Sequence, residues 1–262
     1  CKHSIACANG TDALQLVLMA QGVCAGDAVF VPSFTFTSTA EVVALVGATP
    51  VFIDIDEHSF NMDPASLRAA IEMVQNDTDL KPKAVISVDL FGQPADYAAL
   101  DAIAQENDLW LMVDGAQSFG ATLHGEQSCS KGFAATTSFF PAKPLGCYGD
   151  GGAIFTDDDE LASVIRSLRV HGKGTDKYDN VRVGINSRLD AMQAAILLEK
   201  IDIFPEEIQK REAVAQGYIE SLRGLVELPV IQDGAQSVWA QFTFKTSVRD
   251  ELSAALKKVG VP

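Results

Sequence analysis

The chain has 262 residues, of which 47% are hydrophobic, and a formal net charge of −15 at pH 7. This length and apolar content suffice for one or two domains with a large buried core. The negative charge argues against nucleic acid and anionic membrane as partners, and no apolar run is long enough to span a bilayer.

The cysteines and histidines argue against disulfide bonds and against a structural metal site. The five cysteines include no Cys-x-x-Cys pair, and the four histidines are not spaced as metal ligands. We therefore expect reduced thiols, a cytoplasmic location and no metal site. The chain begins with Cys1 rather than methionine, and so we expect a fragment of a longer protein.

Apolar, strand-like runs alternate with helical patterns as far as Leu168. Strands are predicted at residues 28–31, 49–53, 83–88, 110–113, 134–140 and 153–156. Helices are predicted at residues 12–20, 37–46, 64–74, 97–107 and 157–168. Asp63 is the expected cap of the third helix, with Pro64 in its first turn. Continuous apolar strands separated by helices indicate an α/β fold with a mostly parallel sheet between helices.

The remainder of the chain has a different pattern. A loop rich in Gly, Lys and Asp is predicted at residues 170–185, followed by helices at 187–200 and 205–223, a strand at 239–245 and a helix at 249–258. This α+β pattern predicts a large domain over residues 1–200 and the start of a small, incomplete domain over residues 201–262.

Lys143 lies in the most distinctive loop of the sequence. It is flanked by Pro141 and Pro144, and glycines follow at positions 146, 149, 151 and 152. Proline and glycine exclude an ordinary helix or central strand and predict a stiff loop after the strand at 134–140. Poor solvation lowers the pKa of a lysine and suits it to form a Schiff base. The alternative is a solvated lysine in a surface turn.

Gly10 and Thr11 directly precede the first helical run. A glycine turn that opens a helix presents free backbone N–H groups to an anion. Such a site binds a phosphate without basic side chains, which suits a protein of this net charge. A simple helix cap is the alternative.

Three further residues follow predicted strands. Asp114 ends the strand at 110–113, where ligand sites of α/β sheets lie, and is placed to pair with a protonated ring nitrogen. Gln117 is close enough in sequence to reach the same ligand, and Phe36 is suited to stack on a flat ring. The alternatives are that Asp114 is a structural carboxylate and that Phe36 is a core phenylalanine. Together with Lys143 and the phosphate site, these residues fit pyridoxal phosphate.

Several runs resemble the DegT/StrS nucleotide-sugar aminotransferases, a group of the aspartate-aminotransferase-like (fold-type I) enzymes. They are Asn-Gly-Thr-Asp-Ala at 9–13, Val-Pro-Ser-Phe-Thr-Phe at 31–36, Asp-Gly-Ala-Gln-Ser at 114–118, residues 138–152, Gly-Ile-Asn-Ser-Arg at 184–188 and Asp-Ala-Met-Gln-Ala at 190–194. The resemblance implies an aspartate-aminotransferase-like large domain, a truncated small domain and pyridoxal 5'-phosphate as the cofactor. It also implies family segments before Cys1 and after Pro262.

The same resemblance implies a role for each candidate residue. Lys143 forms the internal aldimine and Asp114 keeps the ring nitrogen protonated. Gln117 bonds the ring hydroxyl, and Phe36 stacks on the ring. Gly10, Thr11 and Ser138 bind the phosphate. Asn186 reaches the phosphate bound in a partner subunit. Arg188 matches an arginine that lies near the substrate. Asn186 therefore implies a homodimer with shared active sites.

The run at residues 139–152 is most similar to family members that aminate UDP-2-acetamido-2-deoxy-3-oxo-glucuronate with glutamate in surface-polysaccharide synthesis. This implies a ping-pong aminotransferase. Another 3- or 4-keto nucleotide sugar is the alternative substrate. A non-catalytic, coenzyme-binding regulatory relative is the alternative from another class. A sugar dehydratase is disfavoured, because that branch of the family has histidine where this chain has Lys143.

Overall fold

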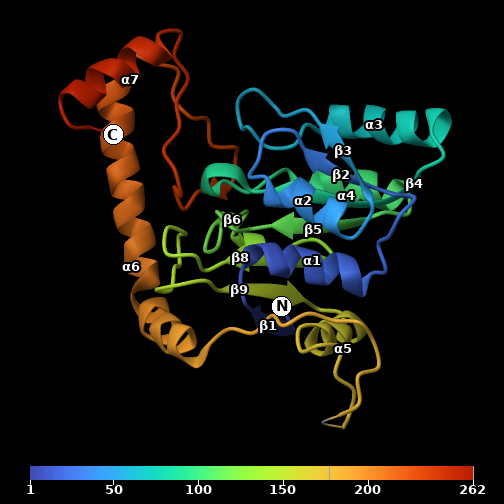
Figure 1. Cartoon of the computed structure of the whole chain (residues 1–262). Helices are drawn as coiled ribbons and strands as arrows, with labels where there is room; N and C mark the ends of the chain where they lie inside the picture. Colours follow the sequence, from blue (N-terminus) through green and yellow to red (C-terminus); the bar gives the residue numbers. More distant parts are fainter. Residues whose placement is uncertain (177, 262) are drawn as a thin grey trace.

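The computed structural model describes residues 1–176 and 178–261 and is built around a seven-stranded sheet (Figure 1). The strand order is β1-β9-β8-β5-β4-β2-β3. In chain order the strands are β1 (His3–Cys7), β2 (Asp27–Pro32), β3 (Thr49–Ile53), β4 (Lys81–Val88), β5 (Trp110–Asp114), β8 (Ala134–Ser138) and β9 (Gly152–Thr156).

The pairing of the strands confirms the mostly parallel sheet. Strands β3, β2, β4, β5 and β8 pair in parallel, whereas β9 pairs antiparallel with both β8 and β1. All six residues of β2 are buried, as expected for a strand that is covered on both faces. The parallel strands end on one side of the sheet, which is where α/β proteins bind their ligands.

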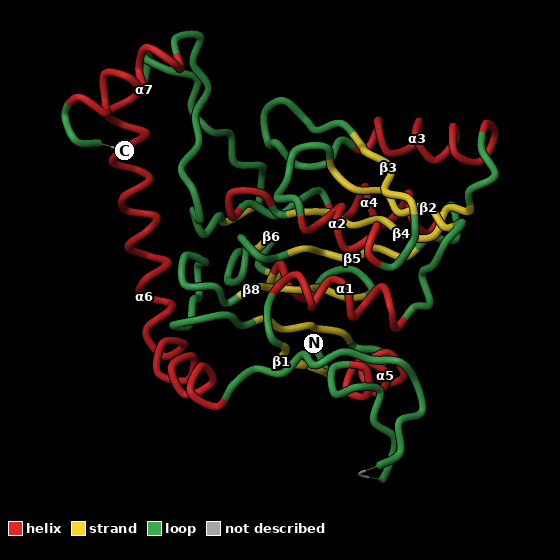
Figure 2. Tube along the Cα trace, in the orientation of Figure 1, coloured by secondary structure: helices red, strands yellow, loops and turns green. Residues whose placement is uncertain are grey.

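Helices cover both faces of this sheet (Figures 1 and 2). One apolar core joins the sheet to α1 (Gly10–Ala20), α2 (Ser38–Leu45) and α5 (Asp159–Leu168). A second core joins the other face to α3 (Pro64–Asp77) and α4 (Tyr97–Glu106). The predicted cap is confirmed, because the Asp63 carboxylate accepts from the backbone N–H groups of Ala65 and Ser66.

The C-terminal part corrects two predictions. Residues 187–200 and 205–223 were expected to form separate helices, but α6 (Ala191–Leu222) continues through Pro205. Phe204 and Ile208 pack into one apolar cluster with Phe119. Burial on both sides of Pro205 therefore offsets the cost of a proline inside a helix, which is typically about 3 kcal/mol and comes from the lost hydrogen bond and a clash of the ring with the preceding turn.

The strand expected at residues 239–245 is also absent from the described structure. Trp239 has a left-handed backbone (φ 48°), and the backbone N–H of Gln241 donates to Phe91 O in the turn after β4 rather than to a neighbouring strand. One isolated bridge, Glu227 with Lys245, remains. The predicted helix is confirmed as α7 (Arg249–Lys258). Two-residue strands β6 (Thr122–Leu123), β7 (Glu126–Gln127) and β10 (Ala235–Gln236) form a second small sheet. The expected domain boundary falls within α6.

Candidate active site

A cavity of about 620 Å³ lies where β5 and β8 end, beside the first turn of α1. This volume is that of a typical small-molecule site. Its wall brings together seven of the nine residues singled out from the sequence: Gly10, Thr11, Phe36, Asp114, Gln117, Ser138 and Lys143.

Lys143 lies on the rigid loop between β8 and β9. Its backbone N–H donates to Phe140 O (2.8 Å), and the loop closes further on through a bond from Cys147 N to Phe139 O (2.8 Å). Leu145 and Cys147 are buried in the cluster that contains Phe204, which anchors the loop to α6. Burial lowers the pKa of the Lys143 amine, and the opposing effect of Asp114 is smaller. The predicted direction of this pKa shift is therefore confirmed.

Asp114 is buried at the end of β5, with 5% of its surface exposed. One carboxylate oxygen accepts from Ala116 N (3.1 Å), and the other lies 3.4 Å from the hydroxyl of Thr39. Burial raises the pKa of Asp114, whereas the Ala116 hydrogen bond and the Lys143 charge lower it. A cationic group in the cavity would compensate this buried carboxylate.

The first turn of α1 and the end of β8 form an anion cradle. Asn9 caps the helix by accepting from Asp12 N (2.8 Å), and the next amides point out of the helix end. A Cβ atom on Gly10 would lie 2.7 Å from the Cβ of Ser138, so only glycine allows these two segments to approach so closely. The cradle offers backbone N–H groups and the Ser138 hydroxyl to an anion.

Phe36 and Gln117 occupy other parts of the cavity wall. Phe36 is 69% exposed and lines the cavity, so it does not lie in the core. The Gln117 amide is oriented by its Oε1, which accepts from the backbone N–H of Phe91 (2.7 Å). This leaves the Nε2 donor for a ligand.

Sequence reasoning missed several residues of this site, among them Thr39, Ala240 and Gln241. Thr39 bonds to Asp114, and Ala240 and Gln241 reach the cavity wall from the far end of the chain. A threonine near the start of a helix gives no distinctive signal, and the segment with Ala240 was interpreted as a strand. The segment that contains Ala240 and Gln241 contacts residues far away in the sequence, and no local sequence pattern indicates such contacts.

Asn186 and Arg188 do not line this cavity in the described chain. Both are exposed, and Arg188 Nε donates to Asn186 Oδ1 (3.1 Å). Asn186 also pairs with Val170 at the base of an exposed loop.

The described residues contain no group of three His, Cys, Asp or Glu side chains that could hold a metal ion. Within the same residues, every helix is too short or too polar to cross a bilayer.

The whole of this chain, residues 1–262, matches the model of the DegT/DnrJ/EryC1/StrS aminotransferase family. The UDP-2-acetamido-2-deoxy-3-oxo-D-glucuronate aminotransferase of Pseudomonas aeruginosa is 52% identical over 262 residues, which are 100% of this chain and 71% of that protein.

Solved structures of aminotransferases also superpose closely on this chain. A DegT/DnrJ/EryC1/StrS aminotransferase from Brucella abortus superposes with a TM-score of 0.98 at 53% identity, covering 99% of this chain and 70% of that one. NtdA from Bacillus subtilis, with the cofactor PMP bound, has a TM-score of 0.85 at 32% identity and covers 96% of this chain and 56% of that one.

Proposed function

The chain belongs to the DegT/DnrJ/EryC1/StrS aminotransferase family, and on this premise we propose that it moves an amino group from glutamate to UDP-2-acetamido-2-deoxy-3-oxo-glucuronate. It is an aminotransferase, and its cofactor is pyridoxal phosphate. The 52% identity to the Pseudomonas enzyme over the whole chain carries the choice of substrate. With this substrate, the protein would act in the cytoplasm, in the synthesis of surface polysaccharide.

The cavity fits this cofactor in chemistry and in shape. The close contact of Gly10 with Ser138 leaves a cradle of donors for the phosphate. The buried Asp114 carboxylate suits a protonated ring nitrogen, and the exposed face of Phe36 suits stacking on a ring. The half-buried Lys143 amine, whose pKa is lowered by burial, suits a covalent bond to an aldehyde.

When bound, the cofactor supplies an electron sink for the bond broken at the substrate carbon. Asp114 would hold the proton on the ring nitrogen, which maintains that sink. Lys143 would accept a proton from the substrate carbon and return it to a neighbouring atom. Burial lowers the pKa of Lys143, which shifts it towards the neutral amine that this proton transfer needs.

We place Asn186 and Arg188 at the active site of a second subunit. Both side chains are exposed and lie outside the cavity of their own chain, which leaves them available to a partner. The working molecule would then be a homodimer with two shared sites.

The test is turnover with defined substrates. Protein loaded with the cofactor should convert glutamate to 2-oxoglutarate in a ratio of one to one with aminated UDP-sugar, measured by mass spectrometry. Asp114→Asn keeps the shape of the side chain but removes its charge, and so we expect it to bind the cofactor yet react about a hundredfold more slowly. A near-normal rate would make Asp114 a structural carboxylate only.

Two outcomes would redirect the proposal. Faster turnover of another 3- or 4-keto nucleotide sugar would keep the reaction and change the substrate. Folded protein that binds cofactor but releases no 2-oxoglutarate would favour a regulatory relative without turnover.

A further inference from the structure

The turn η1 (Leu90–Gly92), which follows β4, lies between the cofactor cavity and the C-terminal part of the chain. On one side, the backbone N–H of Phe91 donates to Gln117 Oε1 (2.7 Å). On the other side, the carbonyl groups of the turn accept hydrogen bonds from residues 237–241.

Three donors from that segment hold the turn. Gly92 O accepts from Val238 N (3.1 Å) and from the Ser237 hydroxyl (3.0 Å), and Phe91 O accepts from Gln241 N (3.3 Å). Ser237 and Val238 are almost fully buried, with 3% and 0% of their surfaces exposed. These bonds are therefore shielded from competing water.

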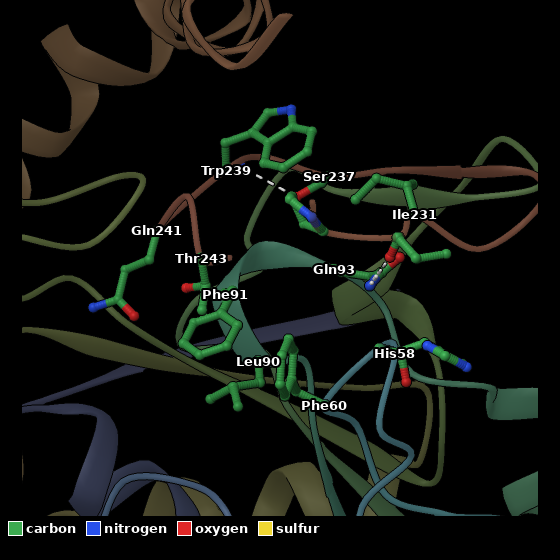
Figure 3. Close-up of a pocket in the computed structure, with 13 residues that line it drawn as sticks. His58, Phe60, Leu90, Phe91, Gln93, Ile231, Ser237, Trp239, Gln241 and Thr243 are labelled. Atoms are coloured by element: carbon green, nitrogen blue, oxygen red, sulfur yellow. Dashed lines mark hydrogen bonds between the residues drawn. The ribbon is translucent and has the colours of Figure 1, made fainter. Parts of the chain in front are cut away.

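Leu90, Phe91, Ser237, Trp239 and Gln241 line a small cavity, and Figure 3 shows Leu90 and Phe91 on one side of it and Ser237 and Trp239 on the other. Its volume of about 20 Å³ has room for roughly one water molecule. The turn and residues 237–241 therefore pack closely against each other and do not form a second ligand site. Gln241 lines both this cavity and the larger one that contains Lys143.

The backbone of the turn depends on these contacts. Phe91 adopts φ 61°, a conformation that bulky residues rarely take, and Gly92 adopts φ 98°. A Cβ atom on Gly92 would lie 2.9 Å from Ala240 N. Only glycine allows the two segments to meet at this distance.

We propose that this turn is a positioning device, in which the Phe91 N–H fixes the orientation of the Gln117 amide and residues 237–241 hold the turn in place. An N–H group can only donate, so it selects Oε1 of the amide and leaves the Nε2 donor for an oxygen of the bound cofactor. The assignment of that ligand rests on the proposed function.

The test is a double-mutant cycle on the affinity for pyridoxal phosphate, measured by absorbance titration. Gly92→Ala should push the turn away from Ala240 and weaken binding about tenfold, the effect of losing one well-oriented hydrogen bond. In a Gln117→Ala background the same change should have almost no further effect, because the turn acts through Gln117.

Gly26→Ala is the matched control. Gly26 has a similar backbone (φ 93°), but its Cβ would meet nothing within 4 Å, so its replacement should leave the affinity unchanged. If Gly92→Ala does not fold, Ser237→Ala takes its place in the cycle, because it removes one donor to Gly92 O without adding an atom.

Each remaining outcome counts against the proposal. An equal loss of affinity with and without Gln117, or no loss in Gly92→Ala, would overturn the positioning role and leave the proposed function intact. Wild-type protein that does not bind the cofactor would overturn both.

Discussion

At the scale of single residues, two buried carboxylates lie close together but have different surroundings. Asp114 faces the cavity, whereas Asp89 lies in the core and accepts from Tyr97 Oη (2.6 Å), Ser118 Oγ (2.5 Å) and Ala95 N (3.0 Å). The backbone N–H of Asp89 donates to Asp114 O (3.1 Å). Asp89 therefore anchors the two loops that carry Phe91 and Gln117.

The titration of Asp89 should make stability depend on pH. Burial raises its pKa from 3.8 to about 7, and the three donors oppose this rise. Because the folded pKa is the higher one, the folded chain holds a proton that the unfolded chain releases. The stabilising contribution is thus complete below roughly pH 4 and is lost as the pH rises through about 7.

We therefore predict that the free energy of unfolding of the wild type falls relative to that of Asp89→Asn between pH 5 and pH 7. The upper limit of this slope is about 1.4 kcal/mol per pH unit. Urea denaturation of both cofactor-free proteins at several pH values measures it. A difference that does not change with pH would contradict the raised pKa.

At the scale of elements, several strands and helices were predictable because their signals are local. Strand β3 and helix α7 have the expected bounds, and Asp63 caps α3 as expected. Edge strand β1 was missed because His3 and Ser4 are polar and Lys2 precedes them, so no continuous apolar run marks it. The error at Pro205 has a different cause, since burial of Phe204 overrode the local preference of proline.

The candidate site was predictable to a similar degree. Seven of the residues identified from the sequence line one cavity, because strand ends and a helix start converge there. Gln241 and the Phe91 turn were not predictable, because their role depends on contacts between residues about 150 positions apart in sequence.

The anion cradle at the start of α1 gives a prediction at this scale. We expect Gly10→Ala to weaken pyridoxal phosphate binding at least about tenfold, because its Cβ would push Ser138 away from the helix end. Gly217→Ala in α6 is the control, since its Cβ would meet nothing within 4 Å. The control should gain roughly 0.5–1 kcal/mol in stability and keep its affinity. Equal affinities for wild type and Gly10→Ala, by titration, would argue against the cradle.

At the scale of the whole molecule, the cavity is built from both ends of the described chain. Gly10 and Thr11 lie near its start, and Ala240 and Gln241 lie near its end. The chain spans 71% of the length of the Pseudomonas relative. In the proposed homodimer, Asn186 and Arg188 complete the site of the second subunit.

Subunit mixing tests this arrangement. Lys143→Ala and Asn186→Ala chains should each be nearly inactive alone. In a mixed dimer, one site would carry both changes and the other neither, so random mixing should restore about a quarter of the wild-type activity. Native mass spectrometry verifies that heterodimers form. If heterodimers form and no activity returns, the sites are not shared.

The central claim is that Lys143 binds the cofactor covalently, and reductive labelling tests it most directly. Protein loaded with pyridoxal phosphate is reduced with borohydride, digested and mapped by mass spectrometry. We predict one modified peptide, with the cofactor on Lys143, in the wild type and in the exposed control Lys257→Ala, and none in Lys143→Ala. A label on any other lysine of the wild type, or no label in protein that has bound the cofactor, would contradict the claim.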